Sequence, residues 1–274
     1  YWNQAYLRKY CIYLMIMKNL FLKLFLSLTI ILFNSNVTKS ESYPDYTREK
    51  NIHNQITSYI FDSDIVELSS KLEEKFNLLA TDSSSDISIL FLHGRGLHPS
   101  EPDVIEPLRI DLINVGYNVF SLQLPVLEKG KSYYDYVKIF KFSDTRIKSA
   151  LNYINSKKNI IIAHSCGAHM LLSFIDNIGI DNISGIILLG AGAVDKGQVM
   201  NTDINLSSYM IPTLNVYAEY DHNSVKQFAD VLKLQYSSSK GEYLNTLEVT
   251  GADHNYKDQT NVLIESVKKW LKAL

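Results

Sequence analysis

Short apolar runs recur along the chain from about residue 43, and each has the length of a β-strand. They are mostly continuous rather than alternating, which is typical of strands that are buried on both faces of a parallel sheet. The runs predict strands at Ile87–Leu92, Asn118–Leu124, Asn159–Ala163, Ile183–Leu189, Thr213–Tyr217 and Thr246–Val249. Two shorter segments upstream, Asp64–Leu68 and Lys75–Ala80, predict an antiparallel hairpin at the edge of the sheet.

Segments with helical periodicity lie between these runs. Residues 103–116 place three apolar side chains on one side and end at Gly116, which is suited to a helix C-cap. The same spacing recurs in residues 143–154, 224–234 and 261–274. Because strands and helices alternate, we expect an α/β fold with a mostly parallel, doubly wound sheet flanked by helices.

The first forty residues differ from the rest of the chain. Lys18 and Lys23 follow Met17, and the uncharged apolar run Leu24–Phe33 comes next. A run of this size fits a secretory signal, whose core spans about 7–15 residues, and is shorter than the roughly 20 residues that cross a bilayer. We expect residues 1–40 to be a leader, with a signal peptide over about 17–40, and residues 41–274 to be one exported domain, periplasmic or secreted. The alternative is an uncleaved membrane anchor, which would keep the domain near a membrane.

The chain opens with Tyr1 rather than Met, and residues 1–16 read as a fragment or an over-extended reading frame.

Composition narrows the classes of function. The 274 residues are 46% hydrophobic and 20% charged, as in an ordinary soluble globular protein. A net charge of −2 implies no basic face, so nucleic acid is not expected as a partner. Cys11 and Cys166 are the two cysteines, which leaves the predicted domain with one cysteine and no internal disulfide.

Ser165 stands where a strand passes into a helix, within the stretch NIIIAHSCGAHM. A tight turn there would strain the serine backbone and lift its hydroxyl out of the sheet, so the residues two before and two after it must be small. Ala163 and Gly167 meet this requirement. Since ligands of doubly wound sheets lie beyond the carboxyl ends of the strands, Ser165 is a candidate nucleophile.

Two backbone N–H groups are candidates for stabilising the oxyanion that such an attack creates. One belongs to Cys166, at the start of the helix after the serine. The other belongs to Arg95, in the loop HGRG after the strand Ile87–Leu92, where Gly94 and Gly96 allow close approach to a ligand. The alternative for Gly94 and Gly96 is a simple turn, and the serine turn nearby favours the functional interpretation.

A serine nucleophile needs a histidine base and an acid that orients it. Of the seven histidines, His254 lies just after a strand in a Gly-containing loop, and Asp221 follows another strand, in the order Ser, Asp, His.

Glu219 remains an alternative acid. Asp253 is expected to cap its own loop, and we expect His164 and His169 to be structural, whereas His93 and His98 could line the site. Cys166 is a poor nucleophile candidate, because its side chain would point into the contact between helix and sheet. We see no cluster with metal-ligand spacing, so neither a metal nor an organic cofactor is implied.

These motifs together resemble the α/β-hydrolase superfamily over roughly residues 64–274. The resemblance implies Ser165 as nucleophile, Asp221 as acid, His254 as base, and Arg95 with Cys166 as oxyanion donors. More narrowly, residues 92–127 are similar to a bacterial family of α/β-hydrolase-like proteins of unknown function, in which a His-Gly-Arg-Gly loop and a Gln-aliphatic-Pro segment recur. Here these are His93–Gly96 and Gln123–Pro125. One departure is Ala163, where the family's serine turn usually begins with Gly.

The spacing of the predicted elements leaves no room for a large cap domain between the strands Ile183–Leu189 and Thr213–Tyr217. The aromatic side chains of residues 126–142 could wall an acyl pocket or pack on the sheet edge, and the side chain of Arg95 could pair with a substrate carboxylate. We expect a serine hydrolase that cleaves esters or related acyl compounds of small molecules through an acyl-serine intermediate. The alternatives are a non-catalytic binding scaffold with the same fold and a hydrolase of amides or thioesters.

Overall fold

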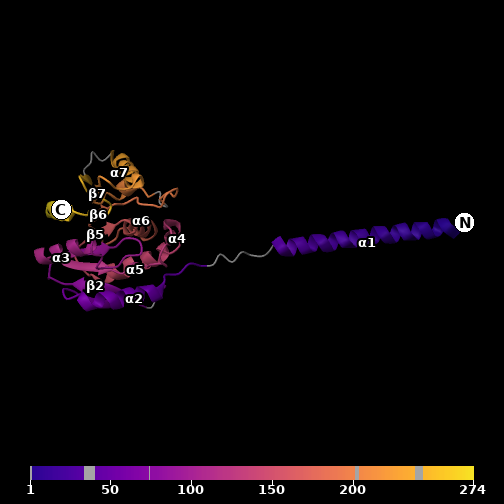
Figure 1. Cartoon of the computed structure of the whole chain (residues 1–274), viewed down its shortest axis with the longest axis horizontal. Helices are drawn as coiled ribbons and strands as arrows, with labels where there is room; N and C mark the ends of the chain where they lie inside the picture. The colour runs from indigo at the N-terminus through magenta and orange to yellow at the C-terminus, as the bar shows by residue number, and fades with distance from the viewer. Residues whose placement is uncertain (1, 34–40, 74, 201–203, 238–242) are drawn as a thin grey trace. The chain divides into compact units, whose positions relative to one another are not determined.

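The computed structural model describes residues 2–33, 41–73, 75–200, 204–237 and 243–274 (Figure 1). The chain divides into two compact units, Tyr1–Glu41 and Ser42–Leu274. In the first unit the structure describes helix α1 (Trp2–Phe33). None of the helices in the described part of the chain has the length and hydropathy to cross a bilayer. The proposed cleavage point after Ser40 lies outside the described residues.

The second unit is built on an eight-stranded sheet with the order β1-β2-β4-β3-β5-β6-β7-β8. The strands from β3 onward pair in parallel, whereas β2 is antiparallel to both β1 and β4. Their bounds are β1 Asp64–Leu68, β2 Phe76–Thr81, β3 Ile87–Leu92, β4 Asn118–Leu122, β5 Lys158–His164, β6 Gly185–Leu189, β7 Thr213–Ala218 and β8 Leu244–Val249. The expected parallel strands and the antiparallel hairpin at the edge are therefore confirmed.

Helices cover both faces of this sheet (Figure 1). Side chains along β3 alternate between two buried clusters, with Leu90 and Leu92 in one and Ile89 and Phe91 in the other. The first cluster is completed by α4 (Tyr133–Val137), α5 (Phe140–Tyr153), α6 (Cys166–Ile178) and α7 (Asn223–Gln235), and the second by α3 (Ile105–Val115) and α8 (Thr260–Ala273). Burial on both faces explains why the strand sequences are continuously apolar.

Some elements differ from expectation. Helix α2 (Tyr46–Ile56), which is followed by the 3₁₀ helix η1 (Thr57–Tyr59), has a largely polar sequence and was not predicted. The end of α3 matches the prediction, since Gly116 adopts a left-handed conformation with φ of 97°. Residues 190–212 connect β6 to β7, and their described part contains the short 3₁₀ helix η2 (Leu206–Tyr209). A connection of this length holds no large cap domain.

Candidate active site

Ser165 occupies a strained turn between β5 and α6. Its backbone has φ of 53° and ψ of −121°, a combination that non-glycine residues adopt at a cost of about 1–3 kcal/mol. The turn is fixed from the neighbouring strand, because the N–H of Ser165 donates to the carbonyl of Leu189 at 2.8 Å. The hydroxyl thus stands at the carboxyl edge of the parallel sheet, where ligands of such sheets bind.

Gly167 has to be small for a reason that the sequence did not reveal. A Cβ at this position would lie 2.5 Å from each of the carbonyl oxygens of Leu92 and His93. The constraint therefore comes from the end of β3, rather than from Ala163 as the turn motif suggested. The serine turn and the loop that carries Arg95 are packed backbone to backbone.

The structure brings the three predicted catalytic side chains into one hydrogen-bonded line. Ser165 Oγ lies 2.9 Å from His254 Nε2, and His254 Nδ1 lies 2.7 Å from Asp221 Oδ1. The acid can only accept from Nδ1–H, so the imidazole presents Nε2 to the hydroxyl in the orientation that a general base requires. The arrangement can deprotonate Ser165 and hold the proton on His254.

The carboxylate of Asp221 is kept ionised although its side chain is buried. Burial acts to raise its pKa, but hydrogen bonds from His254 and from the N–H groups of His222 and Ala218 outweigh this, and the pKa is lowered. Glu219, the alternative acid, instead accepts the N–H of Gly251 at 2.7 Å and so supports the loop that leads to His254. Of the two candidate acids, only Asp221 is hydrogen-bonded to the imidazole of His254.

Gly190, at the end of β6, is a site residue that sequence reasoning missed. It has φ of 58°, and a Cβ there would lie 2.8 Å from His254 Cε1 and 3.5 Å from Asp221 Oδ2. Because Gly190 has no side chain, the imidazole of His254 can occupy this space beside Asp221. The available signal was its position, since Gly190 directly follows an apolar strand as Ser165 does.

Residues 94–97 form a tight turn after β3. The N–H of Leu97 donates to the carbonyl of Gly94 at 3.2 Å, and Gly96 has φ of 70°, the conformation that the third position of a type II turn requires. The N–H groups of Arg95 and Cys166 have no acceptor within the described part of the chain. Both are therefore available to a ligand oxygen.

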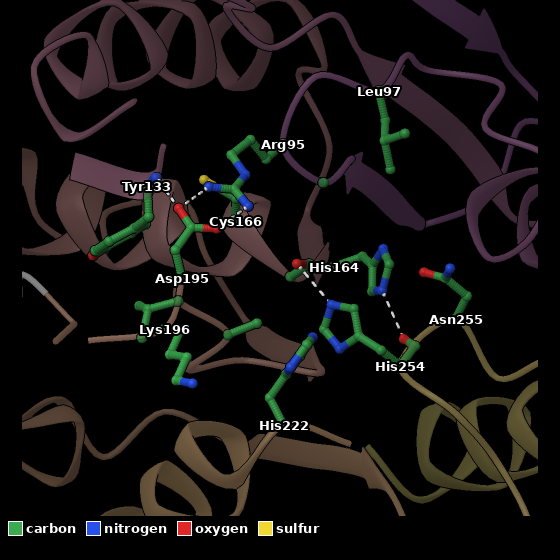
Figure 2. Close-up of a pocket in the computed structure, with 14 residues that line it drawn as sticks. Arg95, Leu97, Tyr133, His164, Cys166, Asp195, Lys196, His222, His254 and Asn255 are labelled. Atoms are coloured by element: carbon green, nitrogen blue, oxygen red, sulfur yellow. Dashed lines mark hydrogen bonds and ion pairs between the residues drawn. The ribbon is translucent and has the colours of Figure 1, made fainter. Parts of the chain in front are cut away.

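The side chain of Arg95 is already paired. It binds Asp195 through two hydrogen bonds of 2.6 and 2.7 Å, and Asp195 also accepts the N–H of Tyr133 at 2.6 Å (Figure 2). One carboxylate thus ties together the loop after β3, the loop after β6 and the start of α4. Sequence reasoning did not single out Asp195, and the pair makes Arg95 less available to a substrate carboxylate than expected.

A cavity of about 420 Å³ opens over Ser165. Apolar side chains and the Arg95–Asp195 pair form much of its wall, and polar side chains form the rest; the lining includes Leu97, Tyr133, Ala193, Val194, Lys196, His222 and Asn255. Of the aromatic side chains in residues 126–142, Tyr133 lines the cavity, whereas Tyr136, Phe140 and Phe142 pack in the core.

The remaining candidates around the nucleophile are buried. Burial raises the pKa of the Cys166 thiol to about 12, so it stays protonated and is no rival nucleophile. His164 and His169 are buried and hydrogen-bonded to the backbone, at His254 O and Gly192 N respectively, as expected of structural histidines. Asp253 caps its loop as predicted, by accepting the N–H groups of residues 255 and 257.

His93 and His98, which the sequence left as residues that could line the site, are not among those that line the cavity. His222 does, and its ring lies 5.1 Å from that of His254. Within the described residues, Asp221, His222 and His254 bring potential metal-ligand atoms within 4.8 Å of one another. Asp221 Oδ1 and His254 Nδ1 are hydrogen-bonded to each other, which accounts for the closeness of these two residues, and the exposed His222 follows Asp221 directly in the chain.

No protein-family model matches the sequence, and a comparison with curated proteins gives no match either. Solved structures do resemble it. An esterase of Pyrococcus furiosus, Pf2001, aligns with a TM-score of 0.60 at 16% identity over 80% of this chain and 93% of its own. Est1E from Butyrivibrio proteoclasticus gives 0.57 at 14% over 77% and 98%, and a dienelactone hydrolase from Anabaena variabilis gives 0.57 at 14% over 77% and 97%. These similar structures are esterases and hydrolases, and the likeness shows that this chain has the α/β-hydrolase fold.

Proposed function

We propose that the protein is a serine hydrolase that cleaves esters of small acyl groups through an acyl-enzyme on Ser165. The observation that carries the proposal is the unbroken line from Asp221 through His254 to Ser165, with contacts of 2.7 and 2.9 Å. A strained serine, an ionised acid and an imidazole held between them have no use in a passive binding surface.

The first half of the reaction forms the acyl-enzyme. Ser165 Oγ attacks the ester carbonyl carbon while His254 Nε2 takes its proton. The carbonyl oxygen becomes an oxyanion, which accepts hydrogen bonds from the N–H groups of Arg95 and Cys166. The bond to the leaving oxygen then breaks, and His254 returns the proton to that oxygen, so that an alcohol departs.

The second half repeats these steps with water. His254 takes a proton from a water molecule, whose oxygen attacks the acyl carbon. Collapse of the second oxyanion breaks the bond to Ser165, and the proton on His254 passes to the serine oxygen. The acid is released, and the enzyme returns to its initial state with no metal or organic cofactor in the scheme.

The cavity favours a short acyl chain. A volume of about 420 Å³, with no large cap domain to extend it, suits small substrates better than long lipids. The comparison structures that are called esterases support the ester reading. Amides and thioesters are the alternative substrates, because the same machinery acts on them.

A fluorophosphonate probe and a series of p-nitrophenyl esters test the proposal. Wild-type protein should be labelled and should hydrolyse acetate and butyrate esters faster than palmitate. Ser165→Ala should abolish labelling and lower kcat at least about 10³-fold. Ser173→Ala, in the helix that follows, is the matched control and should retain both. A folded wild-type protein that is not labelled would favour the binding scaffold, and turnover of amides or thioesters alone would reject the ester class.

Two further proposals concern export and family membership. We propose that the domain is exported to the periplasm or secreted, with residues 17–40 as its signal; N-terminal sequencing of the protein purified from an exporting host would show cleavage near Ser40 or an intact anchor. We also propose that it belongs to the narrower bacterial family with the His-Gly-Arg-Gly loop, on the basis of His93–Gly96 and Gln123–Pro125.

A further inference from the structure

The segment Gln123–Pro125 follows β4 and has no part in the reaction as proposed. It nevertheless contacts the oxyanion loop through one buried side chain. His93 Nε2 lies 3.0 Å from the N–H of Leu124 and 3.2 Å from Gln123 Nε2. The two motifs that the sequence contains, His93–Gly96 and Gln123–Pro125, are therefore in direct contact.

The other nitrogen of His93 acts on the peptide that carries an oxyanion donor. Nδ1 lies 2.9 Å from the carbonyl oxygen of Gly94, which also accepts the N–H of Leu97. The peptide between Gly94 and Arg95 is planar and trans, so its C=O and N–H point in opposite directions. Two hydrogen bonds that fix the Gly94 oxygen thus also fix the direction of the Arg95 N–H.

The hydrogen-bond partners assign one tautomer to His93. Both groups at Nε2 are N–H donors, so Nε2 must accept, and the Gly94 oxygen at Nδ1 requires a donor. His93 is 1% exposed, and burial lowers its pKa to about 3, so the ring is neutral with its proton on Nδ1. A neutral ring of this tautomer satisfies every contact.

Gln123 is itself held by a buried ion cluster. Its carbonyl accepts Arg146 Nη1 at 3.0 Å, and Arg146, which is fully buried, pairs with Glu49 and Glu73. Glu49 also accepts the N–H of Val126 at 3.0 Å. The backbone of residues 123–126 is thereby fixed from α2 and α5.

We infer that His93, held by Gln123 and Leu124, is a positioning residue that aims the Arg95 N–H at the oxyanion. This inference rests on the proposed function, since the donor matters only if an oxyanion forms. It explains why the two motifs occur together. The loop His93–Gly96 supplies the oxyanion donor, and the Gln-aliphatic-Pro segment supplies two N–H groups, from the Gln123 amide and the Leu124 backbone, that donate to His93 Nε2 and orient the ring.

Two amide substitutions separate the contacts of His93. His93→Asn places an amide near the Nδ1 position and can still donate to Gly94, whereas His93→Gln reaches the Nε2 position and can only accept from Leu124. We expect His93→Gln to lower kcat on p-nitrophenyl butyrate about 10- to 100-fold with little change in KM, which is less than the roughly 10²- to 10³-fold loss on removing an oxyanion donor, because the Arg95 N–H is misdirected rather than removed. His93→Asn should keep kcat within about 3-fold although its Tm falls. His53→Gln, in α2, is the matched control and should change neither.

Equal loss of kcat in both variants, in proportion to the fall in Tm, would overturn the inference, as would full kcat in His93→Gln. A readout that needs no activity accompanies these variants. ¹⁵N NMR of histidine in the wild type should show His93 protonated at Nδ1 and neutral down to about pH 4, and protonation at Nε2 would also overturn the inference. A wild type that neither turns over nor reacts with fluorophosphonate would instead reject the proposed function, while the NMR result still decides the orientation of His93.

Discussion

His164 holds the main chain of His254. Its Nε2 donates to the His254 carbonyl oxygen at 3.2 Å, and the two rings lie 5.2 Å apart (Figure 2). Burial lowers the pKa of His164 to about 3, so the ring stays neutral and cannot repel the protonated base. His164, which directly precedes the proposed nucleophile, therefore supports the proposed base, which lies 90 positions further along the chain.

Replacing His164 should test this support. We expect His164→Phe to lower kcat about 10-fold and stability by about 1 kcal/mol, because the bond to His254 is lost and the carbonyl is left without its donor. His164→Gln, whose amide can reach the Nε2 position, should restore most of kcat. Steady-state kinetics and urea unfolding measure both. Equal kcat in the two variants would show that the bond does not position the base.

Gly190→Ala should damage catalysis more than stability. The new methyl would lie 2.8 Å from His254 Cε1, so the imidazole must move away from Ser165, and we expect kcat to fall about 10²-fold. Gly116→Ala is the matched control, because Gly116 also has a positive φ but has nothing within 4 Å of the added atom. It should lose about 1 kcal/mol of stability and no activity. An unchanged kcat in Gly190→Ala would contradict the tight fit.

Asp221→Asn should lower kcat about 10⁴-fold, because an amide cannot stabilise the imidazolium and favours the wrong tautomer. Glu219→Gln should stay within about 3-fold, since this side chain bonds the loop at Gly251 rather than the imidazole. The pair distinguishes the two candidate acids in a single assay with p-nitrophenyl butyrate. A larger loss in Glu219→Gln than in Asp221→Asn would reverse the assignment.

Asp195→Asn should change selectivity. The substitution removes the negative charge that neutralises Arg95, while the amide can still accept the N–H of Tyr133. We expect kcat/KM for an ester with a free carboxylate on its acyl group, such as a hemisuccinate, to rise several-fold relative to the neutral butyrate ester. The pair is about one-third exposed on both sides, so stability should fall by no more than about 1 kcal/mol. A ratio that does not change would show that the guanidinium does not face the substrate.

Asp144, on α5, should make stability depend on pH. Burial raises its pKa to about 6, whereas an unfolded chain has about 4. The protonated form is thus favoured in the folded state, and this contribution to stability is full below pH 4 and is lost as the pH rises through 6. Asp144→Asn should be more stable than wild type at pH 8, by on the order of 2–3 kcal/mol, and equal to it below pH 4. Urea unfolding at both pH values would reject the idea if the difference did not change.

The sheet could be predicted because burial on both faces leaves uninterrupted apolar runs. Strand ends were less exact: β4 stops at Leu122, because Leu124 turns its N–H to His93 instead of continuing the ladder. Helix α2 was not predicted because its buried side chains include the charged Glu49, so the sequence shows little apolar periodicity.

The residues that meet at the site were foreseen where each follows a strand, as Ser165, Asp221 and His254 do. Asp195 and Gly190 were not, since their roles depend on contacts with segments far along the chain. Asp195 meets a partner 100 positions away, and Gly190 is defined by the space that His254 fills. The pairing of Asp195 leaves no local pattern, and the local signal for Gly190 is limited to its place directly after β6.

Gly167 lies where the start of α6 touches the end of β3, with no space for even a methyl group against the carbonyls of Leu92 and His93. Any larger residue there would push Ser165 and the loop His93–Gly96 apart in one movement, so a single substitution would displace the proposed nucleophile and the proposed oxyanion donor at once. Efforts to redesign the substrate range should therefore leave the contact between Gly167 and the end of β3 unchanged. Asp195, on the loop after β6, also lines the cavity and is the position where a substitution should alter selectivity.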